Sequence, residues 1–256
     1  MMRASFSQLG TFSQCSWSWK LAKVDRVPQL QAGWFIHGSA VHAAIEEWEL
    51  SGRTASWVIS YTEAWDKELA EAEAADPDKS RWLRGPRSTT ESDLSRRFGQ
   101  GMDQVGWYVD YVRASEADWE IATMPDGSPA IEVGFDLELG GVQVIGYIDQ
   151  VLYMRQTGTY RVRDLKTGNR VKSSQQLGLY RVALAEVLGL DASEGDYLML
   201  KDGTTTEPYR GQEFDRPYFE KTFAAMHRGV DGKVFIPNPG DGCFTCTSKL
   251  SCAYRA

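Results

Sequence analysis

Two aspartates and a lysine stand on consecutive segments whose side chains alternate as in β-strands: Asp149 on the first, Asp164 and Lys166 on the second. Residues of one parity share a face of a strand. If a turn at Thr157-Gly158 joins the segments, Asp149 lies opposite Asp164 or Lys166, where facing Cβ atoms are about 4.5–5.5 Å apart. The pattern therefore predicts that two carboxylates and an ammonium group converge.

Two carboxylates at that spacing repel each other and lose hydration, so one takes up a proton unless a cation is present. A divalent ion resolves this conflict, and carboxylate oxygens suit Mg²⁺ or Mn²⁺. The alternative is a structural ion pair between Lys166 and one aspartate, with the other aspartate spare at the strand end. These residues alone leave both interpretations open.

Further polar residues lie where they can join this group. His42 stands on a predicted helix and offers a ring nitrogen as an additional metal ligand. Gln176 and Tyr180 are one turn apart on another predicted helix, so they share a face and point back toward the strands. We treat the ordered set as one candidate site.

The four cysteines divide into one near the start of the chain and three near its end: Cys15, then Cys243, Cys246 and Cys252. The first residues lack the apolar core of a secretory signal, so we expect a cytoplasmic protein, in which disulfides are rare. Four thiolates bind zinc or an iron–sulfur cluster. A zinc ribbon usually supplies two close pairs, whereas this pattern is one plus three. Either centre would clamp the two ends of the chain together.

These patterns resemble the RecB-like branch of the PD-(D/E)XK nuclease superfamily. The matching segments are Gly38-Ser39-Ala40-Val41-His42, Gly146-Tyr147-Ile148-Asp149, Asp164-Leu165-Lys166-Thr167-Gly168 and Gln176-Leu177-Gly178-Leu179-Tyr180. The cysteine pattern resembles the iron–sulfur subset of these nucleases, which includes AddB-type subunits and CRISPR-associated RecB-like exonucleases.

The resemblance implies roles for the candidate residues in phosphodiester hydrolysis. Mg²⁺ or Mn²⁺ would be bound by His42, Asp149, Asp164 and the carbonyl of Leu165. Lys166 would orient the attacking water, while Gln176 and Tyr180 would support the site and contact substrate. A structural [4Fe–4S] cluster would be held by Cys15, Cys243, Cys246 and Cys252. Glu132 is either an outer neighbour of the metal or exposed to solvent, because its parity opposes that of the apolar residues beside it.

The net charge of −7 argues against a protein that coats nucleic acid indiscriminately. Local basic groups are present: a run around Trp82 contains Lys79, Arg81, Arg84, Arg87, Arg96 and Arg97, and the candidate site is flanked by Arg161, Arg163, Arg170 and Lys172. Cations interleaved with an aromatic residue suit a single-stranded path. We expect DNA contacts from Arg81, Trp82, Arg84, Arg87, Arg163 and Arg170.

The elements that must position these residues follow from the hydrophobic periodicity. Predicted helices are Gly38–Leu50, Ala55–Ala75, Glu91–Ser115, Ser174–Gly189 and Arg216–Arg228. Predicted strands are Ala130–Leu139, Val142–Met154, Thr159–Leu165 and Asp196–Lys201, with turns at Gly140-Gly141 and Thr157-Gly158. This order indicates an α/β or α+β domain with a helical N-terminal elaboration.

The resemblance refines the fold to a PD-(D/E)XK restriction-endonuclease-like core, with a central mixed sheet flanked by helices. We expect a single domain over residues 1–256. Within it, residues 1–30 and 237–256 would form the iron–sulfur region, 31–118 a helical region and 119–236 the nuclease core.

We therefore expect a metal-dependent DNA exonuclease acting on DNA ends, with single strands as the preferred substrate. It would serve recombination, repair or CRISPR spacer processing, with a protein partner from one of those systems and no membrane association. The chain has no GxxxxGK[ST] phosphate loop and so no ATP motor of its own. The alternative is a catalytically silent or zinc-stabilised DNA-binding or regulatory subunit of the same fold.

Overall fold

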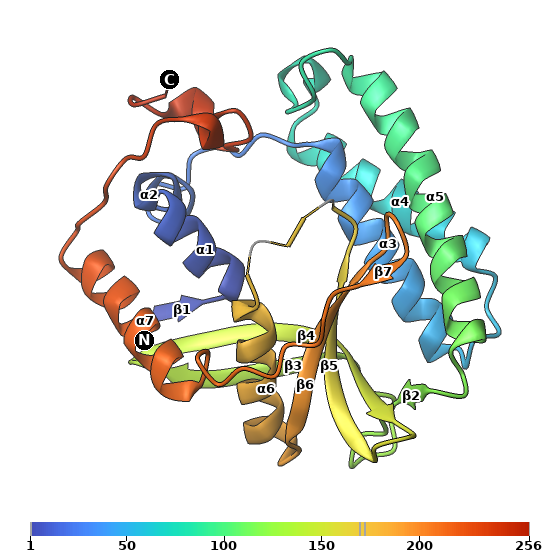
Figure 1. The fold of residues 1–256 in the computed structure, drawn as a ribbon. Coiled ribbons are helices and arrows are strands. Elements are labelled where there is room, and N and C mark those ends of the chain that lie inside the picture. The colour runs from blue at the N-terminus through green and yellow to red at the C-terminus, as the bar shows by residue number, and fades with distance from the viewer. Residues whose placement is uncertain (1, 169, 172, 256) are drawn as a thin grey trace.

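The computed structural model describes residues 2–168, 170–171 and 173–255. Lys172, which the sequence places beside the candidate site, lies outside these residues. Helices cover a central sheet, and the C-terminal segment lies beside the first two helices of the chain (Figure 1). No helix in the described ranges combines the length and apolar character needed to cross a bilayer.

The helices are longer or shorter than predicted by a few residues at most of their ends. They are α1 (Phe6–Gln14), α2 (Ser16–Lys23), α3 (Gly33–Leu50), α4 (Trp57–Ala75), α5 (Thr90–Ala114), α6 (Gln175–Leu188) and α7 (Arg216–Asp231), with 3-10 turns at Lys79–Arg81, Asp241–Cys243 and Lys249–Ser251. The side chain of Ser5 caps α1 and that of Asp215 caps α7, each accepting a backbone N–H of the first turn.

The sheet has seven strands and mixed pairing. The strands are β1 (Met2–Ala4), β2 (Trp119–Ile121), β3 (Ile131–Leu139), β4 (Val142–Met154), β5 (Thr159–Lys166), β6 (Ala192–Met199) and β7 (Thr204–Thr205). Hydrogen-bonded neighbours follow the order β1-β4-β5-β6-β7. β1 and β5 lie along one edge of β4, and β2 and β3 pair with its other edge. The pairs β1·β4 and β5·β6 are parallel, and the others are antiparallel. The predicted α/β fold with a central mixed sheet is confirmed.

The turn between β3 and β4 is the predicted one. Leu139 pairs with Val142, so the loop consists of Gly140 and Gly141 alone. Their φ angles are +60° and +79°, which matches the left-handed backbone that a two-residue hairpin turn requires of both residues.

The turn between β4 and β5 differs from the prediction. Met154 pairs with Thr159, so four residues, 155–158, form the loop in place of Thr157-Gly158 alone. The longer loop shifts the register by two residues, and a two-residue shift leaves every side chain on its original face. The shift therefore keeps Asp149 on the same side as Asp164 and brings the two residues into line.

Pairing between β4 and β5 stops at Gln150 and Arg163, just before these aspartates. Beyond that point, Asp149 Oδ2 accepts a hydrogen bond of 2.7 Å from the backbone N–H of Leu165. A side-chain acceptor thus replaces the missing ladder bond, and the strands part where the candidate site lies.

Two apolar cores hold the sheet between its helices. One contains Leu179 of α6 and Phe219 of α7. The other contains Val41 of α3, Trp65 of α4 and Val105 of α5. In Figure 1, α3, α4 and α5 accordingly lie on one side of the sheet, and α6 lies on the other. Side chains from both helical layers therefore reach the point where β4 and β5 part.

Candidate active site

Asp149 is a buried carboxylate on β4, one residue before Gln150, where the pairing of β4 with β5 stops. Burial raises its pKa, the neighbouring Asp164 raises it further, and His42 opposes the rise, leaving the pKa at about 7. Even with a histidine beside it, the negative charge of this group is therefore incompletely balanced by the cations of the chain.

Asp164 and Lys166 lie on one face of β5. The Nζ of Lys166 is 2.6 Å from Oδ2 of Asp164. Burial raises the pKa of Asp164, and the adjacent ammonium group of Lys166 opposes that rise. Asp164 is almost fully buried, whereas the side chain of Lys166 is 30% exposed, so the lysine is accessible from outside.

Gln176 and Tyr180 of α6 complete a chain of hydrogen bonds around that pair. Lys166 Nζ donates to Gln176 Oε1 at 2.9 Å, and Gln176 Nε2 donates to the hydroxyl oxygen of Tyr180 at 2.8 Å. The Tyr180 hydroxyl donates to Asp164 Oδ1 at 3.2 Å. Burial and the nearby carboxylate of Asp164 hold the pKa of Tyr180 well above its usual value, so the hydroxyl stays a donor.

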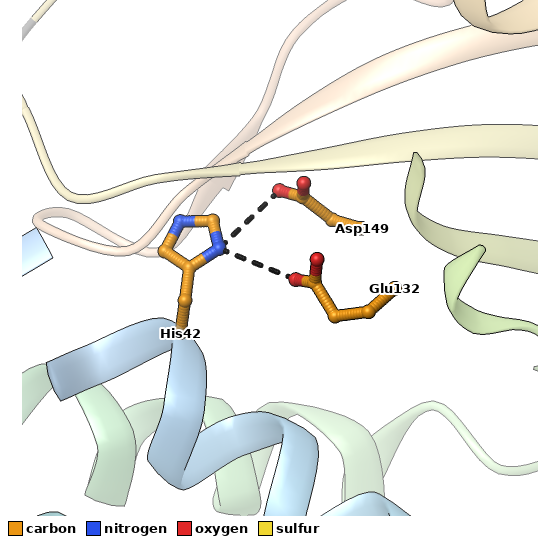
Figure 2. A group of neighbouring side chains, drawn as sticks. All are labelled: His42, Glu132 and Asp149. Carbon is orange, nitrogen blue, oxygen red and sulfur yellow. Dashed lines mark ion pairs between the residues drawn. The ribbon is translucent and has the colours of Figure 1, made fainter. Parts of the chain in front are cut away.

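His42 reaches the group from α3, with its ring turned toward two carboxylates (Figure 2). Its Nε2 lies 3.1 Å from the carbonyl oxygen of Leu165, which can only accept, so Nε2 carries a proton. Nδ1 faces Asp149 Oδ2 at 3.6 Å and Glu132 Oε1 at 3.8 Å. Burial lowers the pKa of His42, but these carboxylates outweigh it and raise the pKa to about 9.

Glu132 joins the group although strict alternation gives it no defined place. Its φ is +46°, in the left-handed region that residues other than glycine rarely adopt. The same part of the sheet breaks the parity of β4, because Ile148 and Val151 have opposite parity yet belong to the same apolar core. The signal that identifies Glu132 is the register of the Gly140-Gly141 hairpin rather than alternation alone: Ile131 pairs with Gln150 and Val133 with Ile148, so Glu132 lies across from Asp149.

His42, Glu132 and Asp149 each place one ligand atom within 4.8 Å of the others. An imidazole and two carboxylates form a donor set that suits a divalent ion, which would balance the two negative charges. The residues therefore fit Mg²⁺ or Mn²⁺. Asp164 lies outside this set of three, held by Lys166 and Tyr180, and the Leu165 carbonyl already accepts from His42.

The cysteines gather where the two ends of the chain meet. Cys15, Cys243 and Cys246 line one cavity of about 270 Å³, while Cys252 is not among its lining residues. Within the described ranges, no three of the cysteine sulfurs lie within 4.8 Å of one another. A tetrahedral zinc site, with Zn–S bonds of about 2.3 Å, places its sulfurs about 3.8 Å apart. The four sulfurs of the described chain are thus not gathered into the compact group that a closed zinc site requires.

Hydrogen bonds join the same two ends. The Ser16 hydroxyl accepts from the backbone N–H of Ile236 at 2.6 Å, and Asn238 Nδ2 donates to the carbonyl of Gln14 at 2.8 Å. The backbone N–H of Leu30 donates to the carbonyl of Thr247 at 2.9 Å. In Figure 1 the red C-terminal segment accordingly lies against the blue helices α1 and α2.

Two of the predicted DNA contacts are wrong because the side chains are interior. Trp82 is 1% exposed, and its indole N–H donates to the carbonyl of Asp76. Arg163 is also 1% exposed, and it binds both carboxylate oxygens of Asp196 at 2.8 Å and the Tyr111 hydroxyl at 3.0 Å. Neither side chain can meet a nucleic acid at the surface.

The other predicted DNA contacts lie at the surface, but the guanidinium group of one of them, Arg84, is hydrogen-bonded within the protein. The guanidinium group of Arg84 donates to the carbonyls of Ser80, Trp82 and Ser88, and so it holds the loop together. Arg81, Arg87 and Arg170 are exposed. They remain candidates for contact with DNA.

Comparison with known proteins relates the whole chain to one superfamily. The model of the PD-(D/E)XK nuclease superfamily matches residues 3–255. The "Gene 69 protein" of Mycobacterium phage D29 is 33% identical over 264 residues, covering 97% of this chain and 95% of that protein. The "Gene 69 protein" of Mycobacterium phage L5 is 30% identical over 277 residues, with the same coverage. The crystal structure of SSO0001 is 16% identical with a TM-score of 0.39, covering 86% of this chain and 85% of that one, a likeness too low to support a functional comparison.

Proposed function

The chain belongs to the PD-(D/E)XK nuclease superfamily, and from this premise we propose that it is a metal-dependent DNA exonuclease of the RecB-like type that acts on single-stranded ends. One observation carries the proposal. His42, Glu132 and Asp149 converge where β4 and β5 part, next to the ion pair of Asp164 and Lys166. Charged groups of these types are costly to bury unless chemistry or a cation requires them.

In this proposal His42, Glu132, Asp149 and Asp164 hold Mg²⁺ or Mn²⁺. A bound ion of this class lowers the pKa of a water molecule and offsets the charge of the phosphate. Lys166 is partly exposed and directed by Gln176, so its ammonium group can orient the attacking water. Tyr180 donates a hydrogen bond to Oδ1 of Asp164, the carboxylate oxygen that does not face Lys166. The carbonyl of Leu165 fixes the ring of His42 so that Nδ1 faces the carboxylates, and its second lone pair leaves a role as a metal ligand open.

The cysteines form the second part of the proposal. We propose that Cys15, Cys243, Cys246 and Cys252 hold a structural [4Fe–4S] cluster in a region made of residues 1–30 and 237–256. The cavity that Cys15, Cys243 and Cys246 share supports a metal centre at this junction, and the one-plus-three pattern of the cysteines supports a cluster over a zinc ion. Residues 31–118 would form the helical region of the same domain and 119–236 its nuclease core.

The two curated relatives come from phages. This supports a role in recombination or repair of phage DNA more than a role in CRISPR spacer capture. The protein partner would then belong to a recombination or repair system.

A time course on end-labelled DNA tests the proposal. Full-length protein, purified without oxygen, would be incubated with single- or double-stranded DNA in Mg²⁺, Mn²⁺ or EDTA. We expect stepwise loss of nucleotides from single strands with either metal and none in EDTA. Tight DNA binding without cleavage would indicate a silent binding subunit, and bound zinc without iron would remove the cluster.

A further inference from the structure

A second group of charged residues lies on α5, outside the candidate active site. Asp93 is 2% exposed, and it bonds two arginines on its own helix: Arg96 through Oδ1, and Arg97 Nε through Oδ2 at 2.8 Å. A buried carboxylate of this kind orients each guanidinium group that it binds.

The N-terminus of α3 is built around this group. A Cβ atom at Gly33 would lie 2.9 Å from Asp93 Oδ2 and 3.0 Å from Arg97 Cδ, so only glycine lets the helices approach. The guanidinium carbon of Arg97 lies 5.5 Å from the ring centroid of Trp34, in the range of a cation–π contact. Arg97 is thus fixed from two sides.

The fixed arginines keep donors for a ligand. Asp93 uses only Nε of Arg97, and within the described ranges neither Nη1 nor Nη2 of that residue has a protein acceptor. The side chain of Arg96 is 49% exposed; its Nη2 donates to Asp93 and its Nη1 to Gln100 Oε1 at 2.8 Å, so Nε is its group without a protein acceptor in the described ranges. A guanidinium group held along one edge presents its other donors in a planar arrangement that fits phosphate oxygens.

Both arginines line a cavity of about 790 Å³ that begins beside the candidate active site. Thr167 and Gly168, which directly follow Lys166, line the same cavity, and Gln104 Nε2 of α5 donates to the carbonyl of Thr167 at 3.1 Å. Trp107 adds an aromatic wall. A second cavity, of about 500 Å³, shares Arg96 and Arg97 and adds the exposed Arg87.

We propose that Asp93, Arg96 and Arg97 form a phosphate clamp that binds the backbone of a single DNA strand leading away from the nuclease site. This inference rests on the proposed function, because it takes the strand to be the substrate. The strand would pass from Lys166 along the cavity, cross the two arginines and continue toward Arg87. Cations with an aromatic wall are the features that bind single strands without sequence preference.

Binding of a fluorescent oligothymidylate by the full-length protein tests the clamp, with anisotropy measured in EDTA at several salt concentrations. We expect Arg96→Gln/Arg97→Gln to weaken binding about tenfold, and its log–log salt slope to fall by about 0.7 for each phosphate that the variant no longer neutralises. Arg113→Gln is the control for a single lost arginine: it removes one positive charge, against two in the clamp variant, from the far end of α5, at a side chain 62% exposed. If removing both arginines leaves the buried Asp93 unpaired and unfolds the protein, Asp93→Asn/Arg96→Gln/Arg97→Gln removes that charge as well.

Unchanged affinity and slope in the folded variant would overturn the clamp, as would an equal loss in Arg113→Gln. Cleavage by the wild type is measured separately in Mg²⁺ and Mn²⁺. Binding that depends on the arginines, in a protein that does not cleave, would keep the clamp and remove the nuclease activity. Cleavage by the clamp variant with an unchanged KM would keep the nuclease activity and remove the clamp.

Discussion

The ring of His42 has one nitrogen committed to the backbone and one directed at the carboxylates. Nε2 donates to Leu165, so Nδ1 is the nitrogen that can take up a proton or a metal ion between Asp149 and Glu132. The site therefore has two occupied states, one protonated and one loaded with metal. Which state prevails depends on pH, because metal binding displaces protons from its ligands.

The stability of the metal-free protein follows from the same two groups. The pKa of His42 is raised from 6.5 to about 9. Its stabilising contribution to the free energy of unfolding is therefore complete below pH 6.5 and is lost as the pH rises toward 9. The pKa of Asp149 is raised from 3.8 to about 7, so its ionisation costs nothing below pH 3.8 and costs most above pH 7. Both effects lower the stability of the metal-free protein as the pH rises.

We predict that Mn²⁺ affinity rises with pH, by up to about tenfold per pH unit for each proton displaced. Isothermal titration at pH 6, 7 and 8 measures this directly, and the increase in melting temperature caused by Mn²⁺ should grow in parallel. The variant His42→Gln, which has no such proton to lose, should show a weaker pH dependence. Affinity that stays constant across this range would contradict the assignment of Nδ1 and Asp149 to the metal.

Gln176 and Tyr180 are positioning residues in this account, because they act through Lys166 and Asp164. We predict that Gln176→Leu and Tyr180→Phe each lower kcat about 10- to 100-fold, as is typical of groups that orient metal-site residues, with little change in KM. Gln175→Leu is the matched control, because Gln175 on the same helix bonds Tyr218 and not the site. Steady-state cleavage rates give the comparison. A fall in Gln175→Leu equal to that in Gln176→Leu would mean that α6 is merely destabilised.

At the scale of elements, the local features of the hairpins were predictable. Gly140-Gly141 defines one turn chemically, and the alternation of β4 and β5 keeps Asp149 and Asp164 on a common side whether the second turn has two residues or four. Both signals lie within a few residues of the chain, so tertiary packing does not override them.

What could not be predicted depends on contacts distant in the sequence. The predicted Gly140-Gly141 hairpin already places Glu132 across from Asp149 in register, whereas its left-handed backbone, with φ at +46°, follows no periodic pattern. The sequence pattern predicts Trp82 and Arg163 as surface groups, since aromatic and basic residues close to one another are typical of nucleic-acid sites. In the folded chain the indole N–H of Trp82 bonds the carbonyl of Asp76, and Arg163 bonds the carboxylate of Asp196. No periodic pattern in the sequence reveals these two contacts.

The ion pair between β5 and β6 offers a test of that correction. We predict that Arg163→Met destabilises the protein by about 1–3 kcal/mol, because the buried carboxylate of Asp196 then keeps only its bond to Arg161. Urea unfolding measures the change. The double variant Arg163→Met/Asp196→Leu should recover much of the loss, while DNA binding by the folded protein stays unchanged. Weaker DNA binding in that double variant would restore Arg163 as a contact.

At the scale of the whole molecule, the two ends of the chain meet and bring the cysteines together. Closing so long a loop removes conformational entropy from the unfolded chain, so a metal centre there would stabilise the fold. Ordinary hydrogen bonds, such as that of Ser16 with Ile236, contribute at the same junction. Variants of the adjacent residues Cys15 and Ser16 separate the contribution of a metal centre from that of the hydrogen bonds.

We predict that Cys15→Ser loses bound iron and melts at a lower temperature than Ser16→Ala. The Ser16 variant should keep its iron and lose about 1 kcal/mol, or about 2–4 °C at this chain length. Iron analysis, the visible absorption spectrum and thermal unfolding give the readouts. Iron content and melting temperature equal to wild type in Cys15→Ser would exclude that thiol from the cluster.

The central claim is that Asp149, Asp164 and Lys166 perform metal-dependent cleavage together. The most direct measurement is the initial rate of nucleotide release from end-labelled single-stranded DNA in Mn²⁺, for Asp149→Asn, Asp164→Asn and Lys166→Met. Asp136→Asn serves as the control, because it removes an exposed carboxylate of β3 that bonds only Gln143 within the described ranges. We expect each site variant to lose about 100-fold or more of the rate, while the control keeps it. Wild-type rates in all three site variants would contradict the account.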